Sequence, residues 1–150
     1  MRRVELMFLG QYEHTIDEKG RMTIPVRYRE QIQNGAYITL GLDKNLIVLT
    51  AQIFDQLYES VNKMSMTNND ARLLKRVFFS KAHRLEIDKA GRILIPQYLR
   101  ENASIDSSAI VVGVGDRFEI WSPELWSEQD EQIMDSEVNS KRFAALDISI

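Results

Sequence analysis

The stretch that decides the fold runs from residue 16 to residue 25 and occurs twice in the chain. Ile16-Asp17-Glu18-Lys19-Gly20-Arg21-Met22-Thr23-Ile24-Pro25 recurs as Ile87-Asp88-Lys89-Ala90-Gly91-Arg92-Ile93-Leu94-Ile95-Pro96, and the match extends through Arg29-Glu30 and Arg100-Glu101. Eight of the fifteen aligned positions are identical. The chain therefore holds two copies of one structural unit, each of about fifty residues, joined by a linker.

Each copy has the pattern of a β unit. Residues 12–16 alternate in polarity like a half-buried strand, and residues 84–87 do the same in the second copy. Asp and Gly then hold the first and fourth positions of a type I turn at 17–20 and at 88–91, which predicts a tight hairpin. The proline after each return strand cannot donate to a sheet but suits the first turn of a helix.

The other elements follow from apolar periodicity. Short helices are expected near 26–32 and 97–102, and pairs of β segments at 36–41 with 46–49 and at 109–114 with 117–121. The linker has two helical apolar faces, one made by Ile53, Leu57, Val61 and Met64 and the other by Leu73, Leu74, Val77 and Phe78. Thr and Asn residues at 67–69 are plausible caps between them.

The C-terminal region predicts one more helix, opening at Ser122-Pro123 with a capping serine and a proline in the first turn. This helix is expected to bury Leu125, Trp126 and Ile133. The residues after it are too apolar for a free tail, so we expect docking on the same subunit or on a neighbour by Phe143, Leu146, Ile148 and Ile150. The predicted fold is α+β, with a first unit at 11–57, a helical linker at 58–82, a second unit at 83–129 and a helix end with a docking tail at 130–150.

Composition excludes several classes of protein and site. The chain has 150 residues, of which 44% are hydrophobic and 27% charged, close to the average for globular proteins, so disorder and low complexity are disfavoured. The absence of cysteine excludes disulfides, thiolate metal sites and cysteine nucleophiles, and with only two histidines a histidine-rich metal centre is disfavoured. We therefore expect no metal, and no other cofactor. Because no apolar run is long enough for a membrane span or a signal peptide, we expect a cytoplasmic protein.

Taken alone, the net charge of −3 disfavours a nucleic-acid partner. However, residues 122–150 hold seven acids and two bases, a net charge of −5, which leaves +2 for residues 1–121. The acidity therefore belongs to the C-terminal segment and does not describe the repeated units.

The repeated Asp and Arg allow two interpretations. Asp17 and Gly20 are explained by the turn alone, and the pair of Asp17 with Arg21 is explained as a surface ion pair of little energetic worth. Yet a turn does not require arginine at the start of the return strand, and Arg92 holds the same place in the second copy. An Asp four residues before an Arg can stiffen the hairpin while the guanidinium keeps donors free for an external anion. The repetition favours a function.

These residues resemble the MraZ family, which is built from two AbrB-like units. The resemblance rests on the doubled Asp-x-x-x-Arg with its x-Ile-Pro, and on residues 7–10, 17–21, 25–30 and 118–121, so it covers nearly the whole chain. It implies swapped-hairpin β units that form a pseudo-two-fold barrel with flanking helices. One departure is that family members usually begin at the position of Met7, so residues 1–6 look like an extension or an alternative start.

The resemblance also implies a function. The family comprises bacterial transcriptional regulators that form rings of several subunits, usually octamers, and bind short direct repeats in double-stranded DNA upstream of their own operon, in the division and cell-wall gene cluster. The implied place of action is the nucleoid. On the matching positions, Arg21 and Lys19 would contact DNA from the turn of Asp17 and Gly20, and Arg92 would be the equivalent of Arg21. Because Ala90 replaces Lys19 and Lys89 replaces Glu18, we predict that the first loop reads the bases.

Individual contacts can be predicted from this interpretation. Arg21 would donate two hydrogen bonds to a guanine, while Lys19 and Arg27 would meet phosphates. Arg29 and Arg100 are expected to pair locally, and His14 to lie on the surface or in an interface. Trp121 and Trp126 are expected in the core or in subunit contacts.

Two other functions are compatible with parts of the sequence. The two Asp and Arg pairs could form the acid/base site of an enzyme, but the sequence shows no candidate nucleophile, metal cluster or glycine-rich phosphate loop. A protein-binding antitoxin is the second alternative, because AbrB-like units occur in antitoxins whose acidic tails cover a toxin, and residues 122–150 are acidic. The helical pattern and the late apolar residues of this segment fit a packed tail better.

Overall fold

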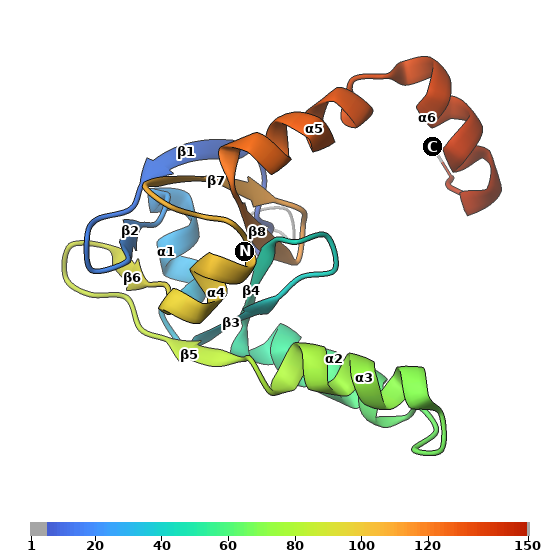
Figure 1. The fold of residues 1–150 in the computed structure, drawn as a ribbon, viewed down its shortest axis with the longest axis horizontal. Helices are drawn as coiled ribbons and strands as arrows, with labels where there is room; N and C mark the ends of the chain where they lie inside the picture. The colour runs from blue at the N-terminus through green and yellow to red at the C-terminus, as the bar shows by residue number, and fades with distance from the viewer. Residues whose placement is uncertain (1–5, 150) are drawn as a thin grey trace.

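The computed structural model describes residues 6–149 and has the predicted α+β architecture (Figure 1). Its antiparallel strands form a six-stranded sheet in the order β1-β7-β8-β4-β3-β5 and a separate two-stranded ribbon, β2-β6. The strands are β1 (Gln11–Thr15), β2 (Arg21–Thr23), β3 (Ala36–Leu40), β4 (Leu46–Thr50), β5 (His83–Leu85), β6 (Arg92–Leu94), β7 (Ser108–Gly113) and β8 (Arg117–Trp121). Among the described residues, these pairings do not close into a barrel.

The two repeats exchange strands. β1 of the first repeat pairs with β7 of the second, from Gln11 opposite Val112 to Thr15 opposite Ser108. In return, β5 of the second repeat pairs with β3 of the first. The ribbon joins one strand from each repeat. The repeats are therefore interleaved and share one sheet.

The predicted hairpin is confirmed at its turn but not along its strands. The N–H of Gly20 donates to the carbonyl of Asp17 at 3.0 Å, and the N–H of Gly91 donates to that of Asp88 at the same distance. Beyond the first turn, β1 and β2 are linked by the isolated bridge of Ile16 with Met22, after which each strand takes a partner from the other repeat. The local sequence specifies the turn, and the partners are set by the rest of the fold.

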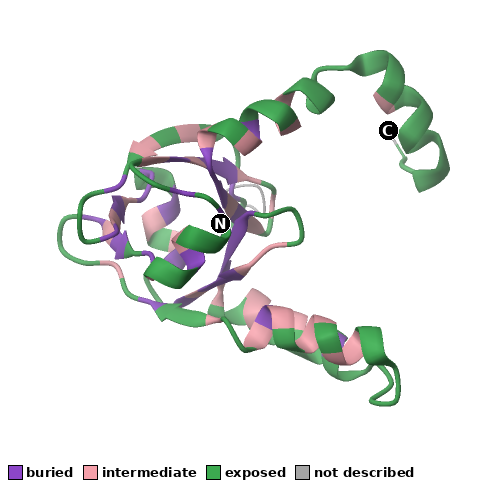
Figure 2. Ribbon diagram, in the orientation of Figure 1, coloured by how far each residue is buried: buried purple, intermediate pink, exposed green. Residues whose placement is uncertain are grey.

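Each proline that ends a ribbon strand starts a short helix, as predicted. Pro25 precedes α1 (Val26–Ile32) and Pro96 precedes α4 (Gln97–Asn102). Both helices pack inside the curved sheet, where Tyr28 and Leu99 are fully buried (Figures 1 and 2). The main core lies between these helices, the sheet and the inner face of the ribbon.

The linker forms the two expected helices, α2 (Ala51–Asn62) and α3 (Asn69–Phe79). The side chain of Thr50 caps α2, and that of Asn68 caps α3 by accepting from the N–H groups of residues 70 and 71. Most of the predicted apolar face packs on β4 or between the helices. The prediction is wrong for Met64, which lies beyond the end of α2 and is 45% exposed, and for Leu73, which is 57% exposed on the outer side of α3.

The C-terminal segment contains α5 (Pro123–Ile133), α6 (Ser136–Phe143) and a final 3-10 turn, η2 (Ala144–Leu146). Ser122 caps α5 as predicted, and Trp126 is buried while Leu125 is half-buried. Ile133 is 50% exposed, contrary to prediction, because α5 continues past the sheet that covers Trp126 (Figure 1).

The predicted docking of the tail on its own subunit is wrong for the described residues. Phe143, Leu146 and Ile148 are 51%, 67% and 69% exposed, because α6 projects away from the sheet (Figures 1 and 2). Docking on a neighbour stays a prediction. The expectations for residues 1–5 and for Ile150 concern positions outside the described range.

Candidate nucleic-acid interface

The first loop is held by one carboxylate. Oδ1 of Asp17 accepts hydrogen bonds from the backbone N–H groups of Lys19 and Arg21, both at 2.9 Å. Oδ2 accepts from Nε of Arg21 at 2.7 Å, which forms the predicted ion pair. Gly20 completes the turn with a φ of +85°, a conformation that costs a side chain roughly 1–2 kcal/mol. These contacts fix the direction of the Arg21 side chain.

The second loop repeats this geometry. Asp88 accepts from the N–H groups of Ala90 and Arg92 at 2.9 Å and from Nε of Arg92 at 2.8 Å. Gly91 has a φ of +78°. Both loops therefore hold an arginine by Nε, and among residues 6–149 the Nη atoms of Arg21 and Arg92 make no hydrogen bond.

The loop electrostatics favour orientation over stability. Hydrogen bonds hold the pKa values of Asp17 and Asp88 below the ordinary value of an aspartate. The largest contribution comes from the backbone N–H of Arg21 or Arg92, and the side chain of the same arginine lowers the pKa further. The paired side chains are about one third exposed, so the ion pairs are screened by solvent and contribute little to folding. The carboxylates stay charged at neutral pH and keep the guanidinium groups in place.

The ribbon brings both arginines to one face. Its register places Arg21 opposite Leu94 and Thr23 opposite Arg92, with Met22 opposite Ile93 between them. Met22 and Ile93 point into the core and are at most 1% exposed. Because side chains alternate along a strand, the two arginines share the outer face, where diagonal neighbours are roughly 7–8 Å apart. This face is a two-stranded surface that carries two oriented guanidinium groups.

Each loop is supported by the other repeat. The N–H of Ile95 donates to the carbonyl of Gly20, and the N–H of Ile24 donates to that of Gly91, both at 2.9 Å. Nε of Arg100 donates to the carbonyl of Ile95 at 2.9 Å.

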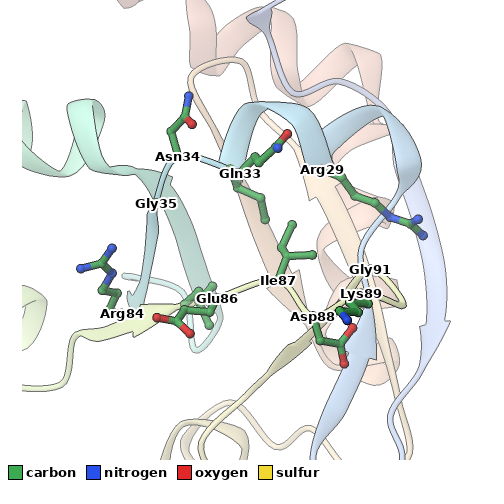
Figure 3. Close-up of a pocket in the computed structure, with 12 residues that line it drawn as sticks. Arg29, Gln33, Asn34, Gly35, Arg84, Glu86, Ile87, Asp88, Lys89 and Gly91 are labelled. Atoms are coloured by element: carbon green, nitrogen blue, oxygen red, sulfur yellow. The ribbon is translucent and has the colours of Figure 1, made fainter.

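Its counterpart, Arg29, donates to the carbonyl of Ile24 at the same distance. The two guanidinium groups lie against the glycines of the opposite loops. A Cβ built on Gly20 would lie 2.9 Å from Nε of Arg100, and one on Gly91 would overlap the Cζ of Arg29. Figure 3 shows Arg29 extending from α1 over the loop that contains Gly91. We call these contacts the crossed arginine supports.

The crossed arginine supports are the functional geometry that sequence reasoning missed. The local pairing predicted for Arg29 and Arg100 is confirmed, but the acceptors are the carbonyls before the prolines. A signal for these contacts was present in the sequence, because each repeat holds a Gly followed nine residues later by an Arg. What the sequence could not supply is that each arginine supports the loop of the other copy.

The two residues predicted to contact phosphates are both exposed. Lys19 lies at the tip of the first loop, and Arg27 lies at the start of α1. His14 is half-buried on β1; burial, and secondly the charge of Arg29, lower its pKa from 6.5. Trp121 and Trp126 are buried with ring centroids 5.5 Å apart, which confirms their place in the core.

A polar groove lies beside the second loop. It has a volume of about 580 Å³ and lies between the end of α1, β5 and the loop, with Arg29, Arg84, Glu86, Asp88 and Lys89 in its wall (Figure 3). The mixture of charges nominates no particular ligand. Within the described range, no three His, Cys, Asp or Glu residues are grouped to hold a metal ion, and no helix is long and apolar enough to cross a membrane.

Comparison with known proteins gives the same doubled pattern. The sequence model of the family described as "MraZ protein, putative antitoxin-like" matches residues 7–77 and again residues 78–147. This chain belongs to the MraZ family. The family resemblance in the repeated loops is thus confirmed over almost the whole chain.

The MraZ relatives are similar over most of their length. A protein of Carboxydothermus hydrogenoformans is 46% identical over 121 residues, covering 81% of this chain and 85% of its own. Proteins of Clostridium acetobutylicum and Moorella thermoacetica are 40% and 42% identical, covering 95% of this chain and 100% of their own. All three are named transcriptional regulators, not enzymes. A solution structure from Pyrococcus horikoshii, PHS018, is 14% identical with a TM-score of 0.33 and covers 77% of this chain and 96% of its own, too distant to bear on the fold.

Proposed function

We propose that this MraZ protein is a sequence-specific DNA-binding transcriptional regulator that reads bases with its first loop. The observation that carries the proposal is the arrangement of Arg21 on the outer face of the ribbon. Asp17 occupies its Nε, and the exposed Nη groups remain for an external acceptor. The relatives' name, transcriptional regulator, supports the same function.

The chemistry of a guanidinium held in this way suits DNA. Arginine binds the O6 and N7 of guanine with two hydrogen bonds, and a two-stranded ribbon fits the major groove. We assign this contact to Arg21 and phosphate contacts to Lys19 and Arg27, which are exposed on the same repeat. Arg92 would make a weaker contact of the same kind, because its loop lacks a lysine next to the glycine.

We further propose that the fold is an AbrB-like swapped-hairpin arrangement and that the chain assembles into a ring, an octamer in the family's usual form. The exchange of β1 and β5 between repeats supports the first point. A ring would present the first loop at regular spacing to direct repeats upstream of the protein's own operon in the division and cell-wall cluster, and linked binding would multiply weak contacts. Its place of action would be the bacterial cytoplasm, on the nucleoid.

Footprinting on the DNA upstream of the protein's own gene tests the proposal. We expect protection of short direct repeats at an even spacing. Titrations at several salt concentrations should show affinity falling steeply, because phosphate contacts release counterions. If the wild-type protein protects no repeat, or if its affinity is independent of salt, DNA reading by the loops is ruled out.

A further inference from the structure

The C-terminal segment and the linker hairpin are two projections that leave the body on different sides. Figure 1 shows α5 and α6 extending from one side of the sheet and α2 with α3 from another, both away from the β2-β6 ribbon. We define the acidic arm as residues 122–149 and the basic flank as residues 63–84. Their separation in Figure 1 means that the two do not contact one another within one chain.

The acidic arm carries an uncovered apolar surface. Six of its large apolar side chains are more than one third exposed: Ile133, Met134, Val138, Phe143, Leu146 and Ile148. Several large exposed apolar side chains on one short segment are typical of an interaction surface. At the base of α5, a groove of about 520 Å³ continues this surface, and the charged residues in its wall are all acidic: Asp43, Glu119 and Asp130.

The basic flank has the complementary character. It holds six bases and one acid, a net charge of +5, against −5 for residues 122–150. On α3, Leu73 is 57% exposed and Arg76 lies on the same helical face, while Met64 and Met66 before the helix are 45% and 78% exposed. Exposed Lys81 and Arg84 follow α3. Apolar side chains and bases are therefore presented to solvent together.

We propose that the acidic arm of one chain docks on the basic flank of a second copy. Opposite charge selects this pairing, and the exposed apolar side chains of the two surfaces supply the burial that holds it. The contact joins two different surfaces, so it is heterologous and generates a ring or a filament. This docking contact would hold neighbouring copies together in the proposed ring. The inference therefore rests on the proposed assembly but not on DNA binding.

The position of this contact has a consequence for the loops. In Figure 1 the acidic arm and the α3 part of the basic flank lie away from the ribbon, while Arg84 lies beside the second loop, so the assembly leaves Arg21 uncovered. Every added copy then contributes one more first loop. The acidic arm, which makes the net charge of the chain negative, acts between subunits and does not face the DNA.

Light scattering without DNA tests the pairing by charge reversal. Glu128, Glu131 and Glu137 are changed to Lys in one variant, and Arg76, Lys81 and Arg84 to Glu in another. We expect a multimeric wild type, a lower mass for each variant alone, and recovery of the multimer when the two variants are mixed. In the mixture the reversed arm suits the reversed flank and the unchanged arm suits the unchanged flank, so alternating copies match at every contact. A control with Glu13, Glu30 and Glu101, all exposed, changed to Lys makes the same change in charge elsewhere and should keep the wild-type mass.

Several results would overturn the proposal: a monomeric wild type, unchanged masses in both variants, no recovery on mixing, or an equal loss in the control. Since the native chain has no cysteine, crosslinking gives a measurement that does not depend on the charge variants folding. Tagged Leu73→Cys is mixed with untagged Val138→Cys and oxidised. A disulfide of mixed mass is expected, and should be absent when Val26→Cys, at a side chain 72% exposed, replaces Leu73→Cys. Equal yields in the two mixtures would refute the contact even if the ring and DNA binding are real.

Discussion

The loop at 17–21 and the loop at 88–92 have the same backbone geometry but different surroundings. Their Nε to Oδ2 distances are 2.7 and 2.8 Å, and both glycines have positive φ. Around this shared frame, Lys19 corresponds to Ala90, and Arg27 to Tyr98. Net charge does not separate the copies, because residues 17–30 hold four bases and three acids, and residues 88–101 three bases and two acids.

The residues that make the turn, the ion pair and the crossed arginine supports are the same in both copies. The exposed residues that make none of these contacts, such as Lys19 and Arg27, differ between the copies. The arrangement of the cations, and not their number, therefore distinguishes the two loops in the proposed contact with DNA.

The largest expected effect comes from the oriented arginines. Arg21→Ala should weaken binding to the operator by roughly 10- to 100-fold, because a bidentate contact to guanine contributes about 1–3 kcal/mol. Arg92→Ala should cost less. Fluorescence anisotropy at one fixed salt concentration measures both. Equal losses would show that the two loops read DNA alike, and no loss in Arg21→Ala would remove the first loop as the reader.

The crossed arginine supports allow a sharper test of the same comparison. Arg100→Ala and Arg29→Ala each remove a charged hydrogen bond to a carbonyl, so each should lower the free energy of unfolding by about 2 kcal/mol. Their local effects should be opposite. Hydrogen exchange should rise at the amides of Lys19 and Arg21 in Arg100→Ala, and at those of Ala90 and Arg92 in Arg29→Ala.

DNA affinity then separates support from stability. If the first loop is the reader, Arg100→Ala should weaken binding more than Arg29→Ala, although the two destabilise the fold equally. Exchange confined in each variant to the loop of its own repeat would contradict the crossed assignment, whatever happens to DNA binding.

The glycines should give a smaller and graded effect. Gly20→Ala and Gly91→Ala both place a side chain at positive φ, which costs about 1 kcal/mol. The added Cβ overlaps Arg29 at Gly91 more severely than it approaches Arg100 at Gly20. Thermal unfolding should therefore show a larger loss for Gly91→Ala. The reverse order would mean that Arg29 moves aside more easily than Arg100 does.

The parts of this molecule that sequence predicted well are those specified by near neighbours. The Asp17 with Arg21 pair, the helices after Pro25 and Pro96, and the Ser122 cap each depend on residues within a few positions. These features follow from turn and helix chemistry.

Strand partners and exposure were harder to predict because they depend on distant residues. Nothing local to β1 says that it pairs with β7 in place of β2, and nothing local to Arg100 says that Gly20 lies beneath it. Ile133 and Leu73 have helical positions that fit an apolar face, yet α5 continues past the sheet that would cover Ile133, and Leu73 is exposed on the linker hairpin. Periodicity predicts the apolar face of a helix but not which of its residues a neighbouring element covers.

The smallest expected effect concerns a position where the repeats differ in ionisation. His14 corresponds to Leu85, which is buried in the second repeat. Because burial and the charge of Arg29 lower the pKa of His14 from 6.5, the native state resists a proton that the unfolded chain accepts. The free energy of unfolding should fall as the pH drops through 6.5 and should level off below the native pKa.

His14→Leu makes the first repeat match the second and should remove this dependence. The effect should be well under the about 1.4 kcal/mol of a full unit of pKa, because solvent screens a half-exposed ring. Urea unfolding of both proteins at pH values from about 5 to 8, which span the ordinary histidine pKa, measures it. If the free energy of unfolding depends on pH as steeply in the variant as in the wild type, the dependence belongs to other groups. β1 and β5 would then contribute equally to the pH dependence despite carrying His14 and Leu85.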